Sequence, residues 1–346
     1  MSRLGTNTTN SIPDSARKMK YIASVKAIDF DGVTDSLRIL NAQGGDGNDF
    51  SYGNASNDEP FSFACWVKLN VTGTGVNSRA TILAKGDSTY IKEYKIFLHD
   101  GVLMFDILDG TDNHYQRAQT VAGVLNADSS TWQHLAVTYN GVGGNSARNG
   151  MNIYIDGINA TASRGGGGTY VAMHNTNSDL TFGNRLDYNN YDMDGQMSDI
   201  MMWKNYELSY MEIDAIFNNG VYSVDPTIDK GSYTGASSLV LWHKCDADKT
   251  LASASSSTVY SNFRDGDTPN TPSGGSVQEL TSGEEFDNNC AGFEDKCWKV
   301  IDPAGTPAVY GQEDFSSKNH HSTYVNGTNL ITDPPTSTSV SQEYAF

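Results

Sequence analysis

Short runs of β-branched and aromatic residues alternate with loops rich in Gly, Asn and Asp over residues 27–224. The runs recur roughly every 8–14 residues, a spacing typical of an all-β sandwich or barrel. In WQHLAVTY the larger apolar side chains are those of Trp132, Leu135, Val137 and Tyr139, close to the alternation of a half-buried strand. The pattern predicts an antiparallel sandwich of two sheets.

One hairpin and one helix are predicted within this segment. NIYIDG ends in Asp156-Gly157, a dipeptide that favours a tight turn between two strands. In LSYMEIDAIFNNG, Ser209 and Glu212 have the spacing of a capping box, and Asn219-Gly220 supplies a left-handed end. The apolar positions that follow the cap share one face: Ile213, Ile216 and Phe217.

Polar segments flank the predicted sandwich. Residues 1–26 are rich in Thr, Asn and Ser and are predicted to form an N-terminal arm. Residues 225–346 begin with a strong strand at Leu239–Trp242, but they offer few further apolar runs. We therefore expect three parts: an arm (1–26), a jelly-roll domain (27–224) and a loop-rich β appendage (225–346) that packs on the sandwich or on a neighbouring subunit.

Composition narrows the classes of function. The chain has 346 residues, of which 41 are acidic and 23 basic, so its formal net charge is -18. This balance disfavours a nucleic-acid partner, because phosphate backbones are repelled by an acidic surface.

The sequence offers no apolar stretch of the ~20 residues that a membrane span needs, and we expect no membrane insertion. The N-terminal segment has no apolar stretch typical of a secretory signal. If the protein works outside a cell, we expect release by lysis or by a dedicated exporter, or else a leader that this sequence does not include.

The four cysteines give little evidence of a disulfide framework. Cys65 lies within FSFACWVKL, where a buried thiol is expected. Cys290 and Cys297 are close enough in sequence to form a bridge, but CAGFEDKC lacks zinc-binding spacing. A disulfide and two free thiols both remain open for this pair.

A series of motifs resembles a known fold family. AIDFDGVTDSLRI, PFSFACWVKL, TILAKGDS, WQHLAVTYNG, MNIYIDGINA, LTFGN and DGQMSDIMMWKNYELSYMEIDAIFNNG occur in this order over residues 27–220. Together they resemble laminin-G-like, or concanavalin A-like, lectin and glucanase domains. The resemblance implies a jelly roll of two curved sheets, with ligands on the concave sheet or on its rim loops. It implies a fold more firmly than a function, because one fold hosts many functions.

Catalysis is not expected. Related endoglucanases place two Glu residues around an Asp on one strand, because retaining hydrolysis needs carboxylates ~5–5.5 Å apart. The nearest matches begin at Glu212 and Glu285, and both lack the second Glu. The sequence has no Gly-x-Ser-x-Gly, and His320-His321 has no third ligand nearby in sequence. Gly165–Gly168 lacks the Lys of a phosphate loop and is predicted to be a hairpin tip.

One loop of the predicted domain suggests carbohydrate binding. Sugars require planar hydrogen-bonding groups for their hydroxyls and an aromatic face for the ring. The loop NRLDYNNYDMD mixes both kinds of side chain, and further aromatic residues are expected at the same rim: Tyr90, Tyr94, His114 and Tyr115. The predicted sugar-binding residues are Arg185, Asp187, Tyr188, Asn189, Tyr191 and Tyr115. An ordinary polar loop is the alternative.

Calcium is the metal that the resemblance favours, because such domains often hold it with loop carbonyls and one or two carboxylates. Asp-rich loops occur at GGDGNDF, LDGTDN and LDYNNYDMDG, and none has the spacing of a twelve-residue calcium loop. A second possibility is a structural ion where Asp199 meets a carbonyl near Asp31-Gly32. The predicted calcium ligands are Asp31, Asp199, Asp192 and Asp194. The alternative is that these Asp and Asn residues only form turns.

A second resemblance concerns SSLVLWHKCDADKT, which is similar to a segment that follows such domains in structural proteins of tailed marine phages. It implies a non-enzymatic virion protein of the capsid surface or tail, whose terminal arms contact its own copies and other virion proteins. Surface glycans are a further expected partner. The expected location is the outer surface of the virion, or else an extracellular one. The alternatives are a free carbohydrate-binding or adhesion module and a degenerate glycoside hydrolase.

Overall fold

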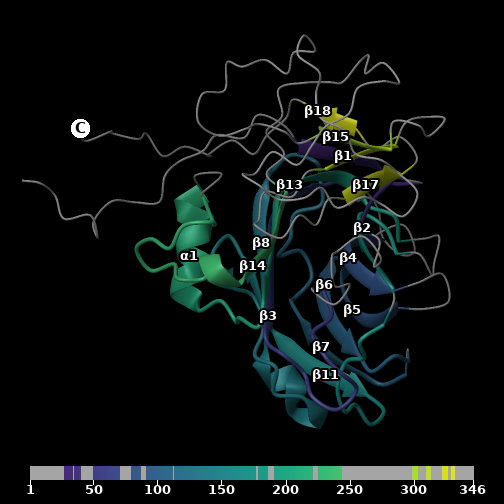
Figure 1. The fold of residues 1–346 in the computed structure, drawn as a ribbon, viewed down its shortest axis with the longest axis vertical. Coiled ribbons are helices and arrows are strands. Elements are labelled where there is room, and N and C mark those ends of the chain that lie inside the picture. The colour runs from purple at the N-terminus through teal and green to yellow at the C-terminus, as the bar shows by residue number, and fades with distance from the viewer. Residues whose placement is uncertain are drawn as a thin grey trace, which may run out of the picture.

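The computed structural model describes most of the sandwich and a few strands near the C-terminus (Figure 1). The described residues are 27–33, 35–39, 50–70, 79–86, 91–111, 113–176, 178–185, 191–220, 225–243, 298–302, 309–312, 322–325 and 329–331. The predicted arm 1–26, the pair Cys290 and Cys297, Glu285 and His320-His321 lie outside these residues.

The protein is an all-β sandwich of two antiparallel sheets, as the alternating pattern predicts. Among the described residues, one sheet has eight strands in the order β10-β9-β8-β3-β13-β1-β18, with β14 paired to β13. Its strands are β1 (Ala27–Asp31), β3 (Phe61–Leu69), β8 (Gln133–Tyr139), β9 (Met151–Ile155), β10 (Ile158–Asn159), β13 (Asp194–Lys204), β14 (Leu239–His243) and β18 (Asn329–Ile331).

In the part of the chain that the structure describes, the second sheet has ten strands in the order β11-β7-β6-β5-β4-β12-β2-β17-β16-β15. Its strands are β2 (Ser36–Ile39), β4 (Arg79–Gly86), β5 (Ile91–His99), β6 (Val102–Leu108), β7 (Tyr115–Gln119), β11 (Ser163–Gly167), β12 (Asp179–Phe182), β15 (Trp298–Asp302), β16 (Val309–Gln312) and β17 (Ser322–Val325). Figure 1 shows β3, β8 and β13 as one layer and β4 to β7 as the other.

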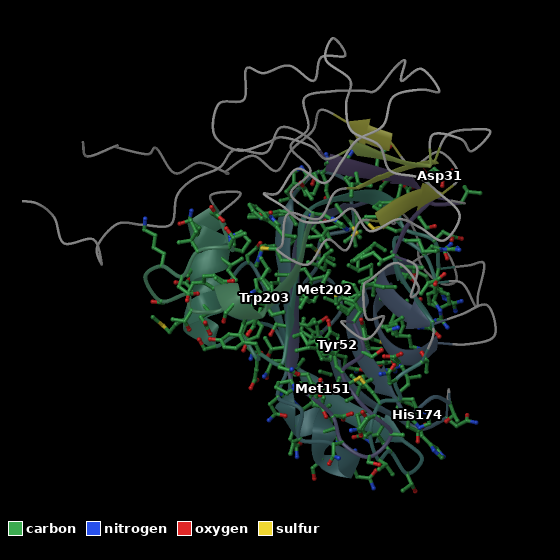
Figure 2. All side chains as sticks on the ribbon, in the orientation of Figure 1. Asp31, Tyr52, Met151, His174, Met202 and Trp203 are labelled. Atoms are coloured by element: carbon green, nitrogen blue, oxygen red, sulfur yellow. The ribbon has the colours of Figure 1, made fainter. Side chains whose placement is uncertain are left out.

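Successive side chains of a strand pack in different apolar clusters, on opposite faces of the sheet. In β13, Met202 belongs to the core between the sheets, whereas Trp203 belongs to a second apolar cluster on the outer face. Figure 2 shows Met202 between the two layers and Trp203 on the side of helix α1. This alternation follows from the strand period of two residues. The inner face of the eight-stranded sheet packs on the other sheet, and its outer face packs on α1 and the residues around it, so both faces carry buried apolar side chains.

Helix α1 (Tyr210–Phe217) covers the outer face of the eight-stranded sheet (Figure 1). The predicted capping box is present: the Ser209 side chain accepts from the Glu212 backbone N–H, and the Glu212 side chain accepts from the Ser209 backbone N–H. The helix ends one residue before the predicted stop, because Asn218 takes the left-handed conformation (φ 50°). Ile213 and Ile216 are buried in the cluster that contains Trp203.

The segment Gly165–Gly168 corrects one expectation from the sequence. It is not a hairpin tip, because Gly165 to Gly167 lie within β11 and pair with β7. A Cβ atom on Gly167 would lie 2.7 Å from Cε1 of Tyr115, and one on Gly166 would lie 2.8 Å from the Tyr115 carbonyl oxygen. The glycines are therefore needed because the Tyr115 strand lies against them.

Other local predictions are confirmed. Asp156 and Gly157 form the turn between β9 and β10, with positive φ angles of 50° and 77°. Cys65 is a buried free thiol. The strand predicted at Leu239–Trp242 is β14, which pairs with β13. The division into residues 1–26, 27–224 and 225–346 stays a prediction. Within the described residues, no helix is long and apolar enough to cross a membrane.

Candidate functional site

The outer face of the ten-stranded sheet presents polar and aromatic side chains. Along β5, Tyr94, Ile96 and Leu98 belong to the core, so the alternate residues Lys95 and Phe97 point the other way. Strand pairing sets Lys95 opposite Asp106 of β6, and Asp106 opposite Arg117 of β7. Register therefore gathers three charged residues from three strands on one face.

Asp106 and Arg117 form the central ion pair of this face. Arg117 donates through Nε and Nη2 to the two carboxylate oxygens at 2.6 and 2.7 Å, which is the paired geometry that guanidinium favours. Lys95 Nζ lies 3.9 Å from Asp106 Oδ2. The Asp106 side chain is only 1% exposed, so both cations act on a carboxylate with little access to water.

Phe97 lies beneath these cations. It is 3% exposed although it is not part of the core between the sheets. The Lys95 ammonium is 5.4 Å and the Arg117 guanidinium carbon 5.7 Å from its ring centroid. A cation over an aromatic face is attracted by the ring quadrupole, so Phe97 helps to fix the direction of both side chains.

Tyr191 joins this group from the loop before β13. Its carbonyl oxygen accepts from the backbone N–H of Thr81 in β4 at 2.8 Å. Its ring meets the ring of Phe97 edge-on, with centroids 6.0 Å apart. The guanidinium carbons of Arg79 and Arg185 lie 4.8 and 4.7 Å from the Tyr191 ring centroid. The aromatic faces of Tyr191 are thus in contact with protein cations.

Tyr115 completes the face on the side of β7. Its ring lies 5.0 Å from the Arg117 guanidinium carbon and packs on Gly167. Burial lowers the pKa of Arg117, but the hydrogen bonds and charge of Asp106, together with Tyr115 and Tyr191, raise it above its ordinary value. Arg117 therefore interacts with both tyrosines, although they are distant in sequence.

The structure brings three of the predicted sugar-binding residues to this face, namely Tyr115, Tyr191 and Arg185. Asp187, Tyr188 and Asn189 lie outside the described residues, as does Tyr90. Tyr94 is wrong as a rim residue, because its ring is fully buried in the core and its hydroxyl donates to the Phe50 carbonyl. His114 is bound to the Asp109 carboxylate through Nδ1 at 2.9 Å.

Sequence reasoning missed the residues that connect these positions: Arg79, Lys95, Phe97, Asp106 and Arg117. A partial signal was present in EYKIFLH, where the charged Lys95 lies between Tyr94 and Ile96 and so marks the face that Phe97 shares at the strand period. The pairing of Asp106 with Arg117 depends on the register between β6 and β7, which the sequence does not reveal.

The predicted calcium ligands fall into two places. Asp31 of β1 pairs with Asp194 of β13, and Asp31 is also a charged neighbour of Asp192. Asp199 lies further along β13, where its carboxylate accepts from Trp242 Nε1 at 2.5 Å. The structure therefore gathers Asp31, Asp192 and Asp194 and places Asp199 elsewhere.

Hydrogen bonds already engage the three gathered carboxylates. Asp31 accepts from the backbone N–H of Val33 at 2.9 Å, Asp194 accepts from Asn70 Nδ2 at 3.0 Å, and Asp192 accepts from Asn184. Burial, with the charge of Asp31, raises the pKa of Asp192 to about 6. Among the described residues no group of three or more His, Cys, Asp or Glu side chains is arranged to hold a metal ion. Calcium binding stays a prediction.

Glu212, considered above for catalysis, serves the fold. Its Oε1 accepts from the Tyr206 hydroxyl at 2.7 Å and from the Thr234 backbone N–H at 3.0 Å. Its Oε2 accepts from the Ser209 backbone N–H at 2.9 Å. These contacts cap α1 and fix the segment around Thr234. Helix α1 lies on the opposite side of the sandwich from the outer face of the ten-stranded sheet (Figure 1).

The model of one protein family, the concanavalin A-like lectin/glucanases superfamily, matches residues 43–214. No curated protein matches the chain significantly. A Bacteroides ovatus protein provisionally assigned to carbohydrate binding is similar over 92% of this chain and 63% of its own, with 11% identity and a TM-score of 0.45.

Two binding domains of botulinum neurotoxins are also similar. That of neurotoxin DC, in complex with SialylT, has 19% identity and a TM-score of 0.34, over 46% of this chain and 35% of its own. That of type G has 15% identity and a TM-score of 0.33, over 46% and 38%. The chain spans less than two thirds of each of these structures. The antiparallel sandwich and the family match agree, and residues 43–214 form a domain with the fold of the concanavalin A-like lectin/glucanases superfamily.

Proposed function

We propose that the protein is a non-catalytic carbohydrate-binding protein and that its ligand lies on the outer face of the ten-stranded sheet. The observation that carries this proposal is the juxtaposition of Tyr115, Arg117 and Tyr191 on that face. Tyr191 is distant in sequence from Tyr115 and Arg117, which both belong to β7. Together the three residues supply aromatic surface beside planar hydrogen-bond donors. This combination suits saccharides, whose rings have apolar faces and hydroxyl rims.

Tyr115 is the best aromatic contact for a sugar ring. It is partly exposed, and Gly167 of β11 leaves its ring uncovered by a side chain from that strand. Tyr191 has guanidinium groups of Arg79 and Arg185 against its ring, so its contribution is to orient those two donors. The same face therefore offers one stacking residue and several fixed donors.

A glycan array followed by titration calorimetry on the best ligand tests the proposal. Tyr115→Ala should weaken binding about tenfold, because an aromatic contact is worth up to about 1.5 kcal/mol and about 1.4 kcal/mol corresponds to a factor of ten in affinity. Tyr210→Ala is the matched control, since Tyr210 is 53% exposed on α1 on the other side of the sandwich. Absence of binding to any glycan, or equal losses for the two variants, would contradict the proposal.

The absence of catalysis is part of the same proposal. Its support is that Glu212 is engaged as a helix cap and accepts from backbone and side-chain donors of Tyr206, Ser209 and Thr234. Incubation with the glycans that bind should release no reducing ends. Hydrolysis that Glu212→Gln or Glu285→Gln abolishes would revive the glycosidase alternative.

We further propose a place for the protein on the outer surface of a virion, with an extracellular location as the alternative. The support is the resemblance of SSLVLWHKCDADKT to segments of tailed-phage structural proteins. In this proposal residues 1–26 and 225–346 contact copies of the chain and other virion proteins. Immunogold labelling of particles tests the location. A stable monomer in solution, whose ends are removed by trace protease, would contradict the assembly role.

A further inference from the structure

Two histidine rings lie at the turn between β6 and β7. His114 is 42% exposed, and its Nδ1 is 2.9 Å from Asp109 Oδ2. His174 is exposed and lies against the next residue of the turn, since a Cβ atom on Gly110 would be 2.7 Å from His174 Nδ1. Figure 2 shows His174 on the side of the ten-stranded sheet, toward the end where Figure 1 places β7 and β11. We call this group the turn cluster: Asp109, His114, His174 and Asn175.

The turn cluster adjoins Tyr115, the aromatic contact of the proposed sugar site. A Cβ atom on Gly167 would lie 2.7 Å from Cε1 of Tyr115 and 3.2 Å from the Asn113 carbonyl oxygen. A Cβ atom on Gly168 would meet Cδ2 of His114 and lie 2.8 Å from the same oxygen. The two rings therefore lie beside one carbonyl group, and consecutive glycines leave both without a covering side chain from that segment.

The segment that carries His174 is fixed at both ends by buried carboxylates. The Met173 backbone N–H donates to Asp58 Oδ1 at 2.7 Å, and the Thr176 backbone N–H donates to Glu93 Oε1 at 2.9 Å. The two residues between these anchors are exposed. Their backbone is already ordered, so a ligand that contacts them loses less free energy to ordering of the chain.

The side chains of the turn cluster suit hydroxyl groups. The Asp109 carboxylate accepts at Nδ1 of His114, so the neutral imidazole keeps its proton there and its Nε2 is an acceptor. The amide of Asn175 can both donate and accept. No group of three or more His, Cys, Asp or Glu side chains in the described part of the chain is arranged to hold a metal ion. We therefore consider an organic ligand for these two histidines.

We propose that the ligand is an oligosaccharide chain that extends from Tyr115 past His114 to His174, so that the turn cluster forms a second subsite. The inference rests on the proposed function and specifies its ligand class. One sugar ring stacks on one aromatic face, so Tyr115 and His174 contact different units of the chain. The hydroxyl groups of the intervening part lie toward His114.

Sugars of increasing length test the inference. The probes are glucose with cellobiose and cellotetraose, galactose with lactose and lacto-N-tetraose, and xylose with xylobiose and xylotetraose. Each is titrated by NMR, which detects the weak binding of single sugars. We expect the longest member of at least one series to bind up to about tenfold tighter than its monosaccharide, because one more ring contact is made.

His174→Ala should remove this gain with length and leave the affinity for the monosaccharide unchanged, whereas Tyr115→Ala should weaken every member of the series. His174→Asn, which keeps a polar side chain without the ring, should behave as His174→Ala does. Tyr210→Ala is the matched control, because it truncates an exposed ring on α1. Circular dichroism verifies the folding of each variant.

Equal affinity along every series would overturn the inference. A gain with length that persists in both His174 variants would also overturn it. In either case a loss of affinity in Tyr115→Ala would leave the proposed function intact. Absence of binding to every sugar would contradict the proposed function itself.

Discussion

The imidazole of His134 is fully buried between the eight-stranded sheet and the C-terminal end of α1. Its centroid lies 5.4 Å from that of Trp66 and 5.8 Å from that of Phe217, and neither ring nitrogen has a hydrogen-bond partner among the described residues. Burial without a partner penalises the charged form and lowers the pKa of His134 to about 3. A histidine was therefore accommodated here as a neutral aromatic ring.

This burial predicts an acid-sensitive fold. An unfolded histidine takes up a proton near pH 6.5, whereas folded His134 does so only at about 3. The unfolded state thus binds more protons between these values, and stability falls as the pH decreases through this window. At pH 4.5 the loss amounts to about 2–3 kcal/mol relative to pH 7.

His134→Phe should remove this loss, because a phenyl ring fits beside Trp66 and Phe217 and does not titrate. Urea unfolding at pH 7 and pH 4.5 measures the difference between the variant and the natural protein. The variant should be the more stable at pH 4.5 by roughly the 2–3 kcal/mol that linkage assigns to the histidine. An identical pH dependence for both proteins would mean that His134 is protonated while folded.

At the scale of elements, β11 determines the position of a proposed ligand contact. Gly167 faces Tyr115 across the pairing of β11 with β7, and a Cβ atom there would lie 2.7 Å from the Tyr115 ring. Gly165 pairs with Arg117 in the same strand, and a Cβ atom at Gly165 would have no heavy atom within 4 Å. Alanine substitutions at these two glycines can therefore be compared, because only the one at Gly167 would contact the Tyr115 ring.

Gly167→Ala should displace the Tyr115 ring and weaken sugar binding at least several-fold, because a ring has few alternative rotamers. Gly165→Ala should bind as the natural protein does and remain as stable or become slightly more so. Calorimetric titration of both variants, with circular dichroism to verify folding, makes the comparison. Equal affinities would show that the Tyr115 ring can move without effect on the ligand.

The strands were more predictable than the face they build. WQHLAVTY became β8 with Leu135, Val137 and Tyr139 in the core, because a period of two residues is written directly in the sequence. Tyr94 was misplaced because its hydroxyl resembles that of a surface residue, yet it donates to the Phe50 carbonyl inside the core. A polar group that is satisfied locally has no separate sequence signature.

Predicting the proposed site would have required knowledge of contacts between residues that are far apart in sequence. Tyr115 and Tyr191 are related through Arg117 and Phe97, and that relation depends on the order β7-β6-β5-β4 in the sheet. Short motifs fix turns and caps, as Ser209 and Glu212 do for α1. Contacts between distant strands follow from topology and register, which local patterns do not specify.

At the scale of the whole molecule, several carboxylates gather at one place. Asp31, Asp35, Asp192 and Asp194 gather near the ends of β1 and β13. For Asp35, burial and then the charge of Asp31 raise the pKa to about 6, and burial chiefly raises that of Asp192 to about 6. These carboxylates repel one another at neutral pH.

This repulsion predicts a pH dependence opposite to that of His134. Between about 4 and 6 the folded Asp35 and Asp192 bind more protons than the unfolded chain, so their contribution to stability decreases as the pH rises. The double variant Asp35→Asn with Asp192→Asn keeps the side-chain acceptors and removes both charges. It should be more stable than the natural protein at pH 7.5, and the difference should vanish near pH 4.

Comparing the natural protein with this double variant in the presence of calcium tests the predicted ion site. A cation bound among Asp31, Asp192 and Asp194 would replace the repulsion by attraction, and it would stabilise the natural protein at pH 7.5 in proportion to the logarithm of its concentration. Thermal unfolding in millimolar calcium and in chelator measures this shift for both proteins, with magnesium as the control ion. A midpoint raised by calcium in the natural protein alone would support an ion at these loops. Identical midpoints in calcium and chelator would mean that protons, and not calcium, relieve the repulsion between these carboxylates.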